Sequence, residues 1–217
     1  MSRGYFITLE GGEGAGKSTL LAHLAAFFEQ KKYTVVVTRE PGGTQLGESI
    51  RDWLLKKNEA VLIGAKAELL LFLAARAQHI EEVILPALNA GYIVLCDRFN
   101  DSTIAYQGGA RGLGVKYVKK MCHLICGNIQ PQLTLFLNVS PEIGLERACK
   151  VQKQQAASGE FDRIEAETLD FHRNIQKTLL SLAKREPLRI YGINANQSCE
   201  AVKSEAIVAI EKLLLLG

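Results

Sequence analysis

The sequence predicts a single α/β domain in which a five-stranded parallel sheet is covered by helices on both faces. Short β-rich apolar runs alternate with longer helical stretches, and no Gly/Ser/Pro-rich linker interrupts them. Apolar residues make up 47% and charged residues 23% of the chain, as in ordinary globular proteins. One domain over residues 1–217 fits this length, because domains commonly hold about 100–200 residues.

Five runs rich in β-branched and aromatic residues are predicted as strands: 5–10, 34–38, 92–97, 133–139 and 188–193. Strands that alternate with helices form parallel sheets that are buried on both faces. The intervening stretches are predicted as helices: 17–30, 46–56, 65–90, 115–126, 141 to about 155, 165–184 and 199–216. Ser140 followed by Pro141 is typical of a helix start.

The segment Lys150 to Gly159 has the composition of a mobile surface loop. It is rich in Gln, Ala, Ser and Gly, which contribute little to a core. We expect a lid segment over roughly residues 147–165.

Charge and composition exclude several classes of protein. The net charge of +3, with no basic run longer than a pair, argues against a nucleic-acid partner. Five cysteines without a Cys-x-x-Cys pair indicate reduced thiols, as in the cytoplasm. The N-terminus enters a strand without a signal peptide, and no apolar run approaches about 18 residues, so no membrane partner is expected.

A phosphate-binding loop follows the first predicted strand. The motif G-x-x-x-x-G-K-[ST] is formed by Gly11, Gly12, Glu13, Gly14, Ala15, Gly16, Lys17 and Ser18, with Thr19 next in the helix. Such a loop between a strand and a helix turns backbone N–H groups toward a phosphate. Lys17 supplies a positive charge, and the Ser18 hydroxyl is suited to Mg²⁺. The sequence therefore predicts ATP and Mg²⁺ as ligands of this loop.

A charged pair lies at the end of the third predicted strand: Asp97 is its last residue, and Arg98 follows directly. An acid at the carboxyl edge of the sheet is suited to support Mg²⁺, and an adjacent guanidinium to grip a second phosphate. A GTPase would place a glycine where Asn100 stands and would carry Asn-Lys-x-Asp, which this sequence lacks. The pattern favours a kinase over a switch.

Four further motifs give the chain a family resemblance. They are Thr38-Arg39-Glu40-Pro41-Gly42-Gly43-Thr44, Asp97-Arg98-Phe99, Ala105-Tyr106-Gln107-Gly108-Gly109 and Glu160-Phe161-Asp162-Arg163-Ile164-Glu165. In this order and spacing they resemble the bacterial thymidylate kinases, over almost the whole chain. The resemblance implies a P-loop kinase fold, a homodimer, and transfer of the ATP γ-phosphoryl to thymidine 5′-monophosphate (dTMP) in dTTP biosynthesis.

The same resemblance assigns residues to the acceptor nucleotide. Glu13, Arg39 and Pro41 are expected near its sugar and phosphate, and Arg98 on the phosphate itself. Phe72 and Arg76 share a helix face four residues apart, so one can stack on thymine while the other donates to its carbonyl edge. Thr103, Tyr106 and Gln107 are expected to read the base and screen the sugar. Lys17, Asp97 and Arg98 are the expected catalytic residues.

A further catalytic cation is expected from the lid. Kinases of this kind carry an arginine either in the P-loop or in the lid, and here Gly14 and Ala15 occupy the loop. The available lid cations are Arg147, Lys150, Lys153 and Arg163, in a segment poorer in arginine than the family pattern. Arg163 is the first candidate and Arg147 the second.

Two other functions remain open at this point. The first is a kinase of another nucleotide or of a nucleoside, because any phosphorylated acceptor suits the P-loop and Arg98. The second is an ATPase that switches a partner surface. The paired motifs at Arg39 and Arg98 have no evident role in such a switch.

Overall fold

The structure is a computed structural model that describes residues 4–56, 62–154 and 162–216. Within them a five-stranded parallel sheet has the order β2-β3-β1-β4-β5. The strands are β1 (Tyr5–Glu10), β2 (Val35–Arg39), β3 (Ile93–Asp97), β4 (Leu133–Asn138) and β5 (Ile190–Asn194). The predicted fold class is therefore confirmed.

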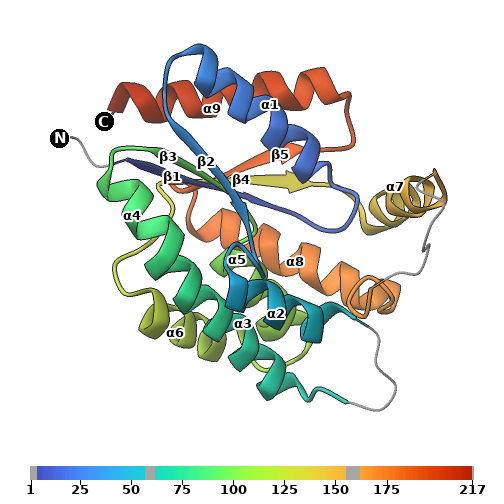
Figure 1. Cartoon of the computed structure of the whole chain (residues 1–217). Coiled ribbons are helices and arrows are strands. Elements are labelled where there is room, and N and C mark those ends of the chain that lie inside the picture. Colours follow the sequence, from blue (N-terminus) through green and yellow to red (C-terminus); the bar gives the residue numbers. More distant parts are fainter. Residues whose placement is uncertain (1–3, 57–61, 155–161, 217) are drawn as a thin grey trace.

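Helices surround this sheet, with π-helical turns in two places (Figure 1). In chain order they are α1 (Lys17–Gln30), α2 (Gln45–Leu55), α3 (Ala65–His79), η1 (Ile80–Ile84), α4 (Leu85–Asn89), α5 (Asn100–Thr103), η2 (Ile104–Ala110), α6 (Val115–Cys126), α7 (Pro141–Gln154), α8 (Leu169–Arg185) and α9 (Cys199–Leu216). None of the described helices is long and apolar enough to cross a membrane.

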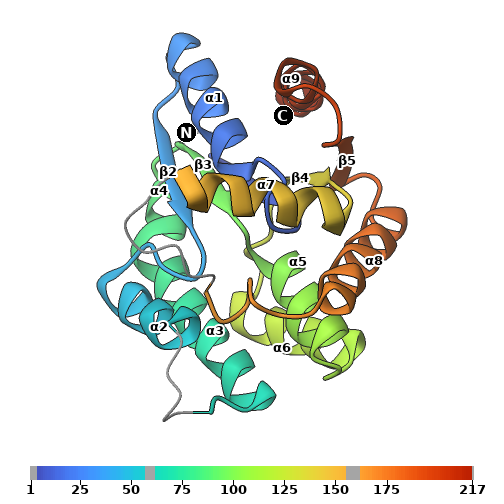
Figure 2. The ribbon, with the colours of Figure 1, turned by 90° about the vertical axis from the view of Figure 1, so that its right-hand side faces the viewer.

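The two faces of the sheet are covered by different helices (Figures 1 and 2). Ile7 and Leu9 of β1 face α1 and α9, where Leu24, Phe28 and Ile210 are completely buried. The opposite face packs on the remaining helices through a second set of buried side chains that includes Phe6, Val94, Phe136 and Ile190. Because side chains alternate along a strand, β1 contributes to both cores.

Several predicted boundaries differ from the observed ones. The stretch 65–90 is divided into α3, η1 and α4 by a π-helical turn, which apolar periodicity does not reveal. The helix expected from residue 165 begins at Leu169, because Thr168 caps it by accepting a hydrogen bond from the Phe171 amide. The last strand begins two residues late, and Leu188 is fully exposed. Residues 100–110, which lie outside the predicted helices, form α5 and η2.

The carboxyl ends of three strands meet at one edge of the sheet. Leu9 of β1 and Arg39 of β2 are both in register with Asp97 at the end of β3. Motifs that lie far apart in the sequence are therefore brought together at this edge, as ligand-binding residues of parallel sheets commonly are.

Candidate active site

The loop between β1 and α1 has the geometry of a phosphate cradle. Gly11, Gly14 and Gly16 have φ angles of 152°, 64° and 89°, which side-chain-bearing residues rarely adopt. The Lys17 ammonium is buried and donates to the carbonyl oxygens of Gly11 (3.2 Å) and Gly12 (2.9 Å). Burial and the charge of Arg98 lower the pKa of Lys17. The backbone of the P-loop thus fixes the position of the Lys17 ammonium.

The backbone of the P-loop also contacts the backbone of α7, the helix in which the predicted lid begins. A Cβ atom built on Gly14 would lie 1.9 Å from the carbonyl oxygen of Gly144 in α7. A Cβ built on Gly144 would lie 2.3 Å from the carbonyl oxygen of Glu13. Helix α7 therefore starts directly against the phosphate-binding loop.

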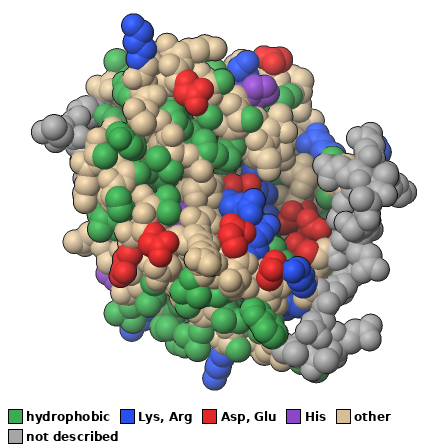
Figure 3. Space-filling model, in the orientation of Figure 1, with side chains coloured by type: hydrophobic (Ala, Val, Ile, Leu, Met, Phe, Trp, Pro, Cys, Tyr) green, Lys and Arg blue, Asp and Glu red, His purple; other side chains and the backbone are tan. Residues whose placement is uncertain are grey.

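A cleft of about 1000 Å³ opens beside this loop. Its walls include Glu13 to Leu20, and acidic and basic side chains gather in a hollow of the face in Figure 3. One end, here the α9 end, is lined by Leu20, Arg147, Ala195, Gln197, Cys199 and Val202. The other, the α3 end, is lined by Pro41, Phe72, Arg76, Thr103, Tyr106 and Gln107. Pockets for a single ligand begin at roughly 300 Å³, so this volume is enough for two small molecules.

Gly11 and Gly12 are the two P-loop residues that do not line this cleft. Their carbonyl oxygens accept hydrogen bonds from the Lys17 ammonium, and Gly11 also accepts from Arg98 (3.0 Å). Ala15, Gly16, Ser18 and Thr19 do line it. Within the predicted nucleotide-binding segment, residues 13–19 therefore line the cleft, whereas Gly11 and Gly12 hold the side chains of Lys17 and Arg98.

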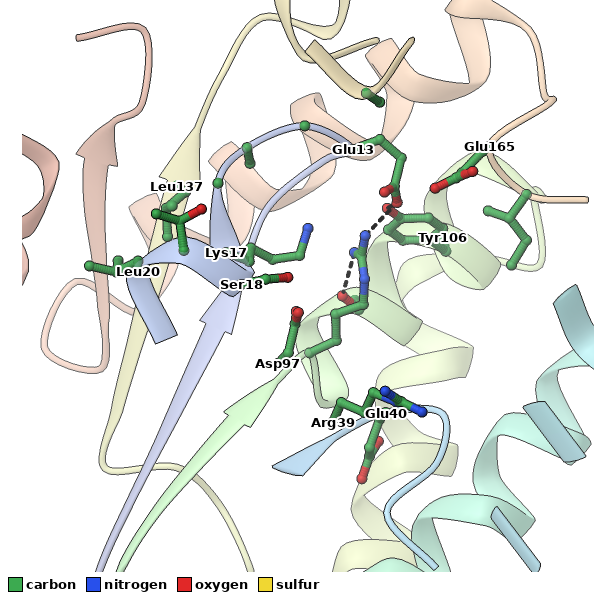
Figure 4. A pocket seen from close by; sticks show the side chains of 18 of the residues that line it. Glu13, Lys17, Ser18, Leu20, Arg39, Glu40, Asp97, Tyr106, Leu137 and Glu165 are labelled. Carbon is green, nitrogen blue, oxygen red and sulfur yellow. Dashed lines mark hydrogen bonds and ion pairs between the residues drawn. The ribbon is translucent and has the colours of Figure 1, made fainter. Parts of the chain in front are cut away.

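Lys17, Ser18 and Asp97 direct their side chains into the same part of the cleft (Figure 4). The Asp97 Oδ1 atom is buried and has no hydrogen-bond partner among the described residues. Those residues contain no cluster of three or more His, Cys, Asp or Glu side chains for a metal. Mg²⁺ at a phosphate site needs only one or two carboxylates, because phosphate oxygens and water complete its shell. A hydroxyl and a carboxylate with one unpaired oxygen beside a P-loop fit Mg²⁺.

Arg98 occupies a strained position next to Asp97. Its φ angle of 70° is left-handed, which is uncommon for a residue with a side chain and recurs at functional sites. Its guanidinium forms an ion pair with Glu13 and lies 5.0 Å from the Tyr106 ring centroid. Burial would lower the pKa of Arg98, but Tyr106 and Glu13 raise it. Arg98 therefore stays charged in the middle of the cleft.

Arg76 lies at the centre of a buried polar network at the α3 end. Its side chain is 1% exposed, and it donates to Glu40 (2.7 Å), Asn100 (3.0 Å) and Thr103 (2.8 Å). Burial would lower the pKa of Arg76, whereas the Glu40 carboxylate raises it. Glu40 also contacts His79 Nδ1 at 2.9 Å. This guanidinium is thus fixed and charged before any ligand arrives.

The other residues predicted at the acceptor site border the same cleft. Arg39 ends β2 and Pro41 follows it, and Arg39 forms an exposed ion pair with Glu48 (2.9 Å). Phe72 is half-buried one helical turn before Arg76. Tyr106 donates to Glu13 (3.2 Å). The structure brings together every residue assigned to the acceptor.

The lid cations are not equally placed. Arg163 does not line the cleft: it donates to the carbonyl oxygen of Leu54 (2.9 Å) and forms an ion pair with Glu68. Arg147 and Lys150 do line it, and Arg147 donates to the carbonyl oxygen of Ala195 (2.8 Å). The side chain of Lys153 and residues 155–161 lie outside the described part. This arrangement does not favour Arg163, the first candidate from the sequence.

Comparison with known proteins identifies the family of the chain. The family model described as thymidylate kinase matches residues 9–206. The chain belongs to the thymidylate kinase family. The thymidylate kinase of Protochlamydia amoebophila (strain UWE25) is 59% identical over 210 residues, which cover 97% of this chain and 93% of that protein. The thymidylate kinase of Bacillus anthracis (strain CDC 684 / NRRL 3495) is 43% identical over 213 residues, covering 98% and 100%.

A solved structure agrees with these relatives. The crystal structure of thymidylate kinase from Ehrlichia chaffeensis has a TM-score of 0.74 to this fold at 31% identity, covering 96% of this chain and 99% of that one. The resemblance drawn from the motifs is thereby confirmed as family membership.

Two residues that reasoning from the sequence did not assign also belong to this thymidylate kinase site. Arg51 of α2 lines the cleft and donates to the carbonyl oxygen of Pro41 (2.8 Å). Burial and the neighbouring Arg39 lower the pKa of Arg51. Glu40 lines the cleft as the partner of Arg76. Glu40 belongs to the motif at residues 38–44, but nothing in the sequence shows that it is buried, and Arg51 lies outside all of the motifs.

Proposed function

We infer that this protein transfers the γ-phosphoryl group of ATP to dTMP and so forms dTDP for dTTP biosynthesis. The observation that carries this function is the cleft itself, in which a P-loop and a second arginine-rich subsite share one continuous space. Membership of the thymidylate kinase family specifies the acceptor.

The P-loop is proposed to bind the phosphates of ATP through its backbone N–H groups. The positive end of α1 adds to their attraction for an anion, and Lys17 supplies a full charge. The ATP base would then lie at the α9 end, beside Leu20, Gln197 and Val202. Mg²⁺ would be held by Ser18 and Asp97 together with phosphate oxygens, and when bound it neutralises charge on those oxygens.

The α3 end is proposed to bind dTMP. Arg39, Arg51 and Arg98 also line the cleft, and the acceptor phosphate must meet the γ-phosphoryl group between its two ends. Phe72 offers a ring face for stacking, and Arg76 offers to a carbonyl edge the Nη2 N–H that is not donated to Thr103. Phosphoryl transfer depends mainly on alignment and charge neutralisation, which is what this set of cations provides.

Arg147 is proposed to replace Arg163 as the lid residue that contacts ATP. It projects from α7, which begins against the P-loop, and it borders the cleft at the α9 end. Arg163 is proposed to anchor the far side of the lid through Glu68.

A coupled ADP-release assay with ATP, Mg²⁺ and each nucleoside monophosphate in turn tests the function. We expect turnover with dTMP and none without an acceptor. Turnover with another monophosphate would replace the acceptor assignment and keep the kinase. Equal ATP consumption without an acceptor would replace the kinase with an ATPase.

We further propose that the protein is a cytoplasmic homodimer without nucleic-acid or membrane partners. Exposed apolar side chains on three neighbouring helices support a dimer: Leu46, Trp53, Leu70, Tyr117 and Leu124. The described cysteines are free, as expected in a reducing compartment. Analytical ultracentrifugation tests the dimer, and fractionation of cells with a specific antibody tests the location.

A further inference from the structure

The buried carboxylate of Glu68 stands outside the residues assigned to either substrate. It lies near the start of α3 and is 1% exposed. Burial would raise the pKa of Glu68, but hydrogen bonds from Gln107 and Arg163 and the charge of Arg111 lower it. Glu68 is therefore an ionised group inside the protein, and its partners must explain why it is there.

Glu68 joins the wall of the cleft to two cations behind it. Its Oε1 atom accepts from Gln107 Nε2 (2.9 Å) and from Arg111 Nε (3.1 Å), and its Oε2 atom accepts from Arg163. Arg111 also forms an ion pair with Glu167, so a second carboxylate shares that cation without touching Gln107. Glu68 is thus the contact between this charged cluster and a residue that lines the cleft.

The contact determines which way round the Gln107 amide lies. A carboxylate only accepts hydrogen bonds, so it must face the amide NH₂ group and not the carbonyl oxygen. The other end of the amide, Oε1, is buried and without a hydrogen-bond partner among the described residues. Gln107 lines the cleft beside Thr103 and Tyr106. A residue that lines the α3 end therefore carries an unpaired acceptor whose orientation is fixed by Glu68.

We propose that Glu68 is a positioning residue that makes the acceptor site selective for a pyrimidine with an N3–H group. It does so by holding the Gln107 carbonyl oxygen toward the base. Thymine and uracil carry a proton on N3 and can donate to that oxygen. Cytosine carries a lone pair on N3, which would meet the oxygen with both acceptors unpaired. This inference rests on the proposed function and adds the basis of base choice to it.

Glu68→Gln tests the proposal because an amide at position 68 can accept or donate, so Gln107 is free to turn. Glu167→Gln is the matched control. It also removes one carboxylate charge that pairs with Arg111, but it leaves the contact between Glu68 and Gln107 in place. Glu68→Asp is a second test, since it keeps a charge opposite Arg111 and Arg163 but shortens the reach to Gln107. If Glu68→Gln does not fold, Glu68→Asp decides.

The measurement is kcat/KM of the full chain for dTMP, dUMP and dCMP, with binding of dTMP and dCMP by calorimetry as a readout without turnover. In both Glu68 variants we expect the dTMP to dCMP ratio to fall about tenfold, the equivalent of one hydrogen bond. The fall should arise mainly in the acceptor KM, while the dTMP to dUMP ratio stays as in the wild type.

An unchanged dTMP to dCMP ratio in a folded Glu68 variant overturns the proposal, and so does an equal fall in Glu167→Gln. These outcomes leave the proposed function intact as long as the wild type prefers dTMP. A wild type that prefers another acceptor in the same assay would overturn the function itself.

Discussion

The two ends of the cleft are built by different means. At the P-loop, successive backbone groups and one lysine form the site within a single stretch of chain. At the α3 end, side chains from α3, from α5 and from the segment after β2 meet in a buried network around Arg76. A phosphate site can therefore be predicted from one sequence motif, whereas a base site depends on how distant segments fold together.

The strongest test of this contrast is removal of the P-loop charge. Lys17→Met should lower kcat about 10³-fold while the melting temperature changes little, because the lost charge acts on developing phosphate charge. Kinetics of ADP release and thermal unfolding measure the two effects. Lys31→Met, at an exposed ion pair with Glu211, is the control and should retain full activity. Retention of a tenth of the wild-type kcat by Lys17→Met would contradict the role of Lys17.

At the α3 end the corresponding change should affect stability as well. Arg76→Met leaves Glu40 as a buried, incompletely paired charge, so we expect a loss of about 3–5 kcal/mol in the free energy of unfolding. The KM for dTMP should also rise. Urea unfolding and acceptor kinetics check these two results.

The double variant Glu40→Gln/Arg76→Met separates the two roles of Arg76. It should regain most of the lost stability but not the affinity for dTMP. If it regained both, Arg76 would be a structural residue and the base-reading role would be wrong.

A pH-dependent effect is expected at Glu10, the last residue of β1 before the P-loop. It is fully buried at the end of β1 and accepts from the Phe99 (2.8 Å) and Ser102 (3.2 Å) amides. Burial, and then the charge of Asp101, raises the pKa of Glu10 from 4.5 to about 7. As pH rises from 4.5 to 7, the unfolded chain loses this proton before the folded one does, so stability falls.

Relative to Glu10→Gln, the wild type should lose about 3 kcal/mol of unfolding free energy over that range, with little change above pH 7 or below 4.5. Chemical denaturation of both proteins at intervals of half a pH unit measures the difference. Parallel curves for the two proteins would show that Glu10 does not titrate in this range.

The smallest expected effect distinguishes the two lid arginines. Arg147→Met should lower kcat/KM for ATP about tenfold, as expected for one charged hydrogen bond. Arg163→Met should leave this value within about threefold and reduce stability instead, because it leaves Glu68 short of a partner. Steady-state kinetics with ATP varied at saturating dTMP decide between them. A larger kinetic effect for Arg163→Met would return the role to that residue.

The sequence predicted the sheet, most helices and the P-loop because each depends on local order: hydrophobic period, glycine spacing and a helix start. The limits of that approach appear at Arg163 and Glu68. Both are charged residues, and only the packed structure shows that they pair with each other away from the cleft. Arg76 is assigned to the base by the family resemblance and its helical spacing from Phe72, but its network with Glu40, Asn100 and Thr103 joins residues from three separate stretches.

The contact between Gly14 and Gly144 limits which amino acids the P-loop can contain. An added Cβ at position 14 would overlap the Gly144 carbonyl oxygen at 1.9 Å, and the backbone there is left-handed. An arginine in the loop at this position would have to displace the first turn of α7. A relative with an arginine at position 14 therefore needs a different residue arrangement at the start of α7. Positions 14 and 144 are expected to vary as a pair among the relatives of this chain.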